Sequence, residues 1–176
     1  MSRVILGIDP GIATMGWGII KIKNQKSKIK NNNPPNSSNL PNLSLVDFGC
    51  IKTPPEQVMP QRLKYVYHQL LKLIKLHQPQ LIAIERLFFG MNSKTAMTVG
   101  QARGIILLAT ANFPKVEIAE LAPLAIKSRL TGYGRTDKNG MKEAVKRILK
   151  LKELPKSDDA ADALAVAICA TMKNAN

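Results

Sequence analysis

The acidic residues are the part of this sequence whose placement most suggests chemistry, because the 176-residue chain has only 12 of them. Asp9 ends the apolar run Val-Ile-Leu-Gly-Ile, and Glu85 ends the apolar run Leu-Ile-Ala-Ile. A carboxylate at the end of a buried strand loses hydration and therefore needs a partner. For either residue taken alone, a helix cap or a salt bridge is as good an explanation as a reactive site.

A second acidic group is the run Ser157-Asp158-Asp159-Ala160-Ala161-Asp162. On a helix, residues three or four apart share a face, so Asp162 pairs with either Asp159 or Asp158, and the spacing does not choose between them. Acids in a first helical turn are also ordinary partners of the helix dipole. That explanation suits Asp158 and Asp159, but it suits Asp162 less well, because Asp162 falls in the second turn among alanines.

Divalent metal would relieve the repulsion among four or five carboxylates brought together from two strands and one helix. Magnesium prefers oxygen ligands, and two such ions about 3.5–4 Å apart can clamp an in-line phosphoryl displacement. The formal net charge of +14, from 26 Lys and Arg against 12 Asp and Glu, favours a polyanionic partner over a merely solvated surface. Together these features predict magnesium-dependent cleavage of nucleic acid.

The elements that must position these acids follow from the apolar pattern. Three early strands in hairpin style, then helices alternating with strands, predict an α/β domain with a mixed five-stranded sheet and helices on both faces. A single domain over residues 1–176 is expected. The expected strands are 3–9, 15–23, 45–52, 80–85 and 116–119, and the expected helices lie around 63–74, 93–112, 141–149 and 158–170, with a short one after Pro123.

The segment Asn24–Ser44 differs from the rest of the chain, since it holds seven Asn, four Ser, three Pro and three Lys. Such a composition buries too little apolar surface to order itself, so we expect a disordered insertion at a hairpin tip. Other features argue against membrane association: no apolar run approaches the roughly 20 residues needed to span a bilayer, and no signal peptide is apparent. A cytoplasmic location is therefore expected. Cys50 and Cys169 are too few for a disulfide framework, and we expect both to be reduced and buried.

Four segments in order resemble the RuvC family of Holliday junction resolvases, which have an RNase H-like fold. They are Gly7-Ile8-Asp9-Pro10-Gly11, Ala83-Ile84-Glu85, Gly100-Gln101-Ala102-Arg103-Gly104 and Asp159-Ala160-Ala161-Asp162-Ala163-Leu164-Ala165. The resemblance implies a homodimeric crossover junction endodeoxyribonuclease that binds four-way DNA junctions and makes paired symmetric nicks. It also implies cooperation with the RuvA and RuvB branch-migration machinery. The insertion is longer than the tight turn usual in the family.

The resemblance also implies site residues. Asp9, Glu85, Asp159 and Asp162 would be the catalytic carboxylates and the ligands of two Mg²⁺ ions, for which Mn²⁺ is expected to substitute. Asp158 becomes an extra neighbour in this register. The helix that carries the glycines of the third segment is one candidate dimer surface, and close packing of that helix on its own sheet is the alternative.

Further residues are candidates for DNA contact. The resemblance places Lys127 and Lys138 near the scissile phosphate and Phe88 near the junction bases, whereas a solvated helix lysine and a core aromatic are the alternatives. Lys138 is expected in a polar loop with Arg135, which is a plausible phosphate site. Arg103 is as plausibly structural as DNA-facing.

Three other functions compete with this interpretation. A related RNase H-like nuclease of the YqgF type would act on structured RNA, and fold alone does not separate it from a resolvase. A sugar-kinase or actin-like ATPase needs two such domains, but this chain has room for one. A non-catalytic junction-binding protein would need no clustered acids, because acids weaken binding to phosphate.

Overall fold

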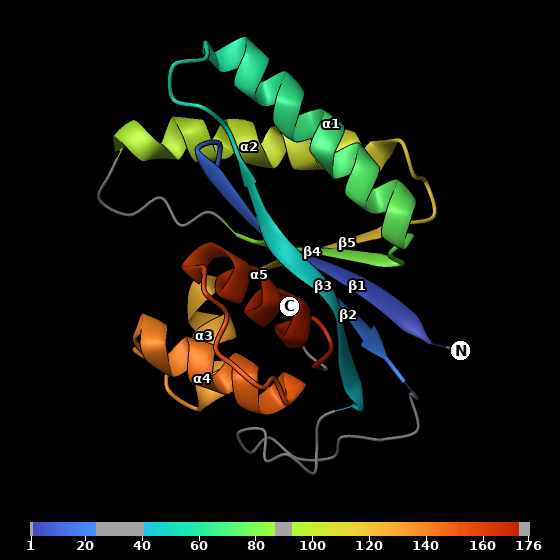
Figure 1. Cartoon of the computed structure of the whole chain (residues 1–176), viewed down its shortest axis with the longest axis vertical. Helices are drawn as coiled ribbons and strands as arrows, with labels where there is room; N and C mark the ends of the chain where they lie inside the picture. Colours follow the sequence, from blue (N-terminus) through green and yellow to red (C-terminus); the bar gives the residue numbers. More distant parts are fainter. Residues whose placement is uncertain (1, 24–40, 87–92, 173–176) are drawn as a thin grey trace.

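A computed structural model describes residues 2–23, 41–86 and 93–172 of the chain (Figure 1). Five strands form one sheet in the order β3-β2-β1-β4-β5. The β1–β2 and β2–β3 pairs are antiparallel, whereas β1–β4 and β4–β5 are parallel, so the predicted mixed five-stranded sheet is confirmed. The strands are β1 (Arg3–Asp9), β2 (Thr14–Ile22), β3 (Leu43–Lys52), β4 (Leu81–Glu85) and β5 (Glu117–Leu121).

Helices cover both faces of this sheet, as expected. Two long helices lie on one face, and three shorter helices lie on the other (Figure 1). None of the helices in the described ranges is both long and apolar enough to cross a membrane. The first face carries α1 (Met59–His77) and α2 (Ser93–Ala111), and the second carries α3 (Pro123–Thr131), α4 (Lys138–Leu149) and α5 (Asp158–Cys169).

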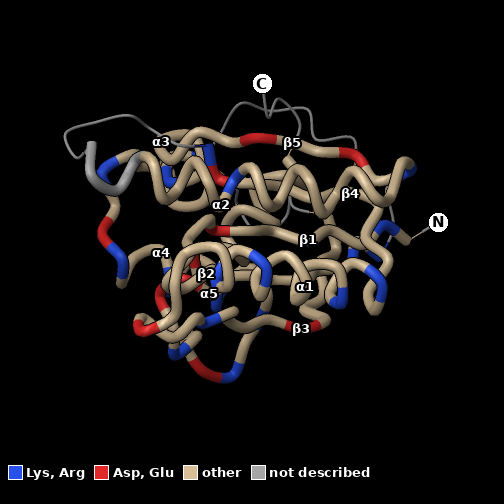
Figure 2. The backbone as a smooth tube through the Cα atoms, turned by 90° about the horizontal axis from the view of Figure 1, so that it is seen from above, with Lys and Arg blue, Asp and Glu red and all other residues tan. Residues whose placement is uncertain are grey.

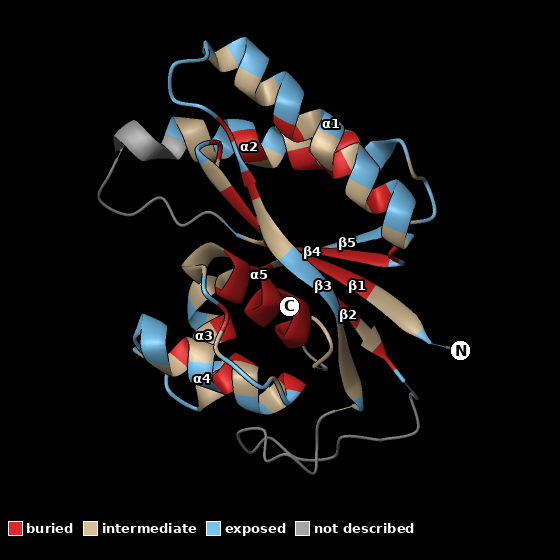
Figure 3. Cartoon of the chain, viewed as in Figure 1, coloured by how far each residue is buried: buried red, intermediate tan, exposed pale blue. Residues whose placement is uncertain are grey.

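Alternation along the central strands divides the apolar side chains between two cores. Successive strand residues point to opposite faces. Ile5 of β1 therefore packs with α5, whereas its neighbours Leu6 and Ile8 pack with α1 and α2. Helix α5 is buried over most of its length (Figure 3), which explains why its sequence is almost wholly alanine and aliphatic after the first turn.

Two predicted strand boundaries were wrong by about two residues. Strand β3 begins at Leu43, because Leu43 and Ser44 pair with the end of β2 and so leave the expected insertion. Strand β5 continues to Leu121, because its parallel ladder with β4 runs on until Leu121 lies opposite Glu85. Residues 24–40 of the expected insertion lie outside the described residues.

Candidate active site

Asp9 and Glu85 are neighbours across the centre of the sheet. Strands β1 and β4 run parallel with Ile8 opposite Ile84, so the two carboxylates that follow lie side by side at the carboxyl ends of these strands. Alternation turns both toward the face that α5 covers. Burial raises the pKa of both carboxyl groups, and a hydrogen bond between the two side chains adds to the rise at Asp9 and opposes it at Glu85.

Glycines in the sheet allow the acids of α5 to lie near the carboxyl ends of β1 and β4. Gly16 of β2 lies directly opposite Asp9 in the antiparallel pair. A Cβ atom at Gly16 would overlap the backbone carbonyl of Asp159, so the first turn of α5 rests on this glycine. Further along, Gly7 takes the same close contact with the carbonyl of Ala163. Small residues on both surfaces thus let a helix lie against the sheet with its first two turns beside Asp9.

The four acids act on one another electrostatically. The pKa of Asp9 is raised to about 8, chiefly by burial and then by the negative charges of Glu85, Asp162 and Asp159. Burial also raises the pKa of Glu85, with the charge of Asp162 adding to it. The pKa of Asp162 is likewise raised, mainly by burial. Each of these shifts favours the neutral acid, and with a pKa of about 8 Asp9 retains its proton at neutral pH.

In the described part of the chain, the acids lie near enough to affect one another's pKa but not close enough to bind a metal ion together. Within the described ranges, no three carboxylate, imidazole or thiol groups converge closely enough to hold a metal ion. Carboxylates of like charge disfavour closer approach unless a proton or a cation lies between them. The donor set itself, which consists of carboxylate oxygens alone, is the chemistry that magnesium prefers.

A cavity of about 230 Å³ opens beside the acids and brings two of the predicted lysines to them. Glu85 and Asp162 line it, together with Lys127 of α3 and Lys138 of α4. Lys138 is the first residue of α4 and not part of a loop, because Asp137 accepts a hydrogen bond from the backbone of Gly140 and so starts the helix. The positive charge of Lys127 lowers the pKa of Glu85 and Asp162, in opposition to burial.

Of the other candidates for DNA contact, Arg135 and Arg103 do not line this cavity. Phe88 lies outside the described residues. Arg135 is exposed in the turn between α3 and α4. Arg103 forms an ion pair with Glu120 of β5, in which its Nε lies 2.7 Å from Oε1, on the opposite face of the sheet. That ion pair gives Arg103 a structural contact between α2 and β5.

The glycines of α2 face open space. A Cβ atom added at Gly100 or Gly104 would meet no atom within 4 Å, and both residues are exposed. Close packing of these glycines on their own sheet, one of the two alternatives, is therefore wrong. The other alternative, a surface between subunits, stays open.

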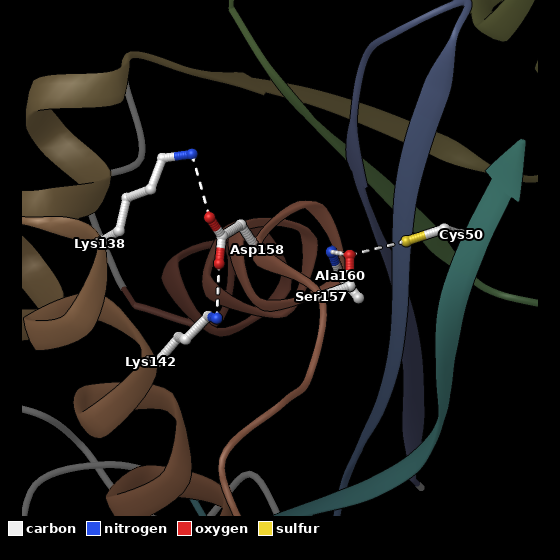
Figure 4. A network of polar contacts seen from close by, with 6 residues as sticks. All are labelled: Cys50, Lys138, Lys142, Ser157, Asp158 and Ala160. Atoms are coloured by element: carbon white, nitrogen blue, oxygen red, sulfur yellow. Dashed lines mark hydrogen bonds and ion pairs between the residues drawn. The ribbon is translucent and has the colours of Figure 1, made fainter.

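Asp158 is directed to lysines and not to the other acids, a contact that the sequence did not predict (Figure 4). The hydrogen bonds from Lys142 and Lys138 lower the pKa of Asp158. The preceding residue, Ser157, caps α5, and its hydroxyl lies 3.0 Å from the thiol of Cys50. Cys50 is only half-buried, contrary to expectation, because β3 is an edge strand of the sheet.

Basic residues surround the acids without being confined to one element. Lys and Arg occur on helices and loops on both sides of the sheet (Figure 2). Such a distribution would attract a polyanion toward the molecule from many directions.

Comparisons with known proteins agree on one family. The family model described as crossover junction endodeoxyribonuclease RuvC matches residues 36–170. The protein of that name from Alkaliphilus metalliredigens is 45% identical over 166 residues, which are 94% of this chain and 91% of the relative. Thermus thermophilus RuvC has been solved alone and with a Holliday junction substrate. These structures match with TM-scores of 0.78 and 0.80 at 29% identity, over 95% of this chain and 92% of theirs.

Proposed function

This chain belongs to the RuvC family of crossover junction endodeoxyribonucleases, and we propose that it resolves four-way DNA junctions by paired symmetric nicks in phosphodiester bonds. Its fold is RNase H-like, like that of the Thermus relative. One observation supports the assignment to a nuclease site. Asp9, Glu85, Asp159 and Asp162 interact near the carboxyl ends of β1 and β4, beside a cavity that two lysines line. The Thermus relative forms a complex with a Holliday junction substrate, which supports the same substrate here.

Metal dependence is a property of this family, and the four carboxylates would hold the metal in this chain. Their donors are all oxygen, and the raised pKa of Asp9 marks a site where negative charge lacks compensation. We propose Mg²⁺ as the ion, two per subunit, with Mn²⁺ able to replace it. When bound, the metal would supply charge compensation to the acids and activate water for attack on phosphorus.

The chain's own residues account for the rest of the site. Lys127 and Lys138 line the cavity from two different helices, so they can contact phosphate oxygens from different sides. Burial of Glu85 and Asp162 at the wall of the cavity keeps the carboxylates poorly hydrated. Phosphate contacts by lysine fix the position of the backbone but read no sequence, which fits a substrate recognised by its shape.

A homodimer with one site per subunit is the simplest source of two symmetric cuts, since twofold dimers are the commonest oligomers. The exposed side of α2 supports a contact surface. Met97 is 74% exposed and Leu108 is 56% exposed, and the open glycines Gly100 and Gly104 lie between them. The glycines leave room for a second copy of the helix to approach closely, and that copy would bury the exposed apolar side chains. By family membership we also propose cooperation with RuvA and RuvB, and a cytoplasmic location.

The decisive experiment compares cleavage of a synthetic four-way junction, a linear duplex of the same sequence and a structured RNA, with magnesium and with EDTA. We expect magnesium-dependent nicks at symmetric positions in the junction and little cleavage of the other two. Preferential cleavage of the RNA would indicate instead an RNA nuclease of the same fold. Junction binding without any cleavage would indicate a non-catalytic binding protein.

A further inference from the structure

Asp158 lies between two lysines that the preceding helix presents to it. Its Oδ2 is 3.1 Å from the Nζ of Lys138, and its Oδ1 is 2.5 Å from the Nζ of Lys142 (Figure 4). The lysines are four residues apart, so they share a face of α4. Each oxygen of the carboxylate therefore takes one ammonium, and the contact joins the beginning of α4 to the beginning of α5.

The two lysines differ in how firmly their surroundings hold them. The side chain of Lys142 is 19% exposed, whereas that of Lys138 is 76% exposed. Packing thus restrains Lys142 and leaves Lys138 free to move, because a long exposed side chain has many rotamers. Asp158 is consequently anchored on one side by Lys142 and can fix the ammonium of Lys138 on the other.

Lys138 has other anions within reach. It lines the same cavity as Glu85 and Asp162. The charges of Asp162 and Asp159 also act on it, although more weakly than Asp158 does. A lysine released by Asp158 would move toward these carboxylates, where it would neutralise the acids and lie away from an incoming phosphate.

We propose that Asp158 is a positioning residue that holds the Lys138 ammonium at the rim of the cavity, clear of the acidic group and available to a substrate phosphate. This role rests on the proposed junction cleavage. It distinguishes Asp158 from Asp159, which follows it in sequence. Asp158 forms ion pairs with the two lysines, whereas Asp159 belongs to the acidic group around Asp9.

A double-mutant cycle tests the role. The variants are Asp158→Asn, Lys138→Ala and the two combined, measured as single-turnover cleavage of a four-way junction at saturating protein. We expect Asp158→Asn to slow cleavage about tenfold, which is less than the roughly 10²-fold that a 1 Å misplacement can cost. In the Lys138→Ala background the same change should cost less than about twofold, because coupled residues are not additive.

Two further measurements distinguish positioning from a merely structural part in α5. Junction affinity in EDTA should be unchanged or tighter for Asp158→Asn, since a negative charge near phosphate is removed while the cleavage step slows. Asp158→Glu, which keeps the charge, should restore most of the rate. Glu143→Gln provides a matched control, because Glu143 is an exposed acid on the same helix α4; it should leave cleavage unchanged.

Two results would overturn the proposal: equal slowing by Asp158→Asn in both backgrounds, or cleavage by Asp158→Asn within twofold of the unmodified chain. Thermal melting of each variant identifies a folding defect, and in that case Asp158→Ala replaces Asp158→Asn in the cycle, because it also removes the charge that holds Lys138. If the unmodified chain does not cut junctions, then the proposed function itself fails. If it cuts them but the cycle is additive, then only the role of Asp158 fails.

Discussion

On one face of the sheet, α5 lies against glycines with a surface of alanines, whereas on the other face α1 and α2 pack on large aliphatic side chains. Gly7 and Gly16 have no room for a Cβ atom beneath α5, whereas Gly100 and Gly104 of α2 have open space around them. The first face needs close approach because the helix must carry its acids to the strand ends. The second face has no such requirement, and its helix α2 leaves large apolar side chains exposed.

This difference separates two uses of small residues. Beneath α5 they set the distance between acids from different elements, so their loss would disturb the site and the core together. On α2 they lie at the surface and affect the core little, so they are available for contact with a second molecule. The proposed chemistry and the proposed dimer contact therefore fall on opposite faces.

The strongest test of the division replaces one acid on each face. Asp9→Asn should lower the cleavage rate by about 10²- to 10³-fold or more while keeping junction binding, since a preorganised charge is lost with little change in shape. Glu120→Gln is its counterpart on the α2 face, where Glu120 pairs with Arg103. That variant should keep a rate within a few-fold of the unmodified chain. Gel-based cleavage assays at saturating protein measure both, and a large loss in Glu120→Gln would contradict the division.

The glycines give a second test, in stability. Gly7→Ala should destabilise the fold by about 1–3 kcal/mol, because its methyl group would overlap the backbone of α5. Gly104→Ala should instead stabilise the monomer by up to about 1 kcal/mol, since alanine is the better helix former and finds open space. Urea unfolding measures both changes. Sedimentation of Gly104→Ala would show in addition whether the methyl group weakens self-association.

The acids should also give stability a particular pH dependence in metal-free buffer. The pKa of Asp9 is about 8 in the folded chain against an ordinary value of 3.8, so the folded form holds the extra proton between these values. The free energy of unfolding should therefore fall as pH rises from about 4 to about 8. Asp9→Asn should flatten this decline, whereas Glu120→Gln should keep it. Urea titrations at pH 5 and pH 8 provide the measurement, and an equal decline in Asp9→Asn would argue against the buried charge.

The smallest expected effect concerns single phosphate contacts. Junction affinity should weaken with salt, and Lys127→Ala should reduce the slope of log affinity against log salt by about one unit. Lys115 is exposed at the opposite end of the sheet, just before β5. Lys115→Ala should leave the slope unchanged. Equal slopes for Lys127→Ala and the unmodified chain would remove Lys127 from the phosphate contacts.

The local features of this protein can be predicted from its amino-acid sequence. The apolar runs before Asp9 and Glu85 predicted buried strands that end in carboxylates, and the structure has both strands ending there. The alanines after Asp159 are small enough for this helix to lie close to the sheet, as its contacts with Gly7 and Gly16 show. Such features can be predicted because apolar periodicity and residue size act within a few residues of sequence.

The contacts between distant elements depend on the folded arrangement of the whole chain. The parallel pairing of β1 with β4 makes Asp9 and Glu85 neighbours although 76 positions separate them, and Asp158 turned to the lysines of α4. Arg103 forms an ion pair with Glu120, and the glycines of α2 are exposed. Charge and size at one position do not specify which of several partners will be nearest. Strand order and helix placement decide that, because they minimise the exposed apolar surface of the whole chain.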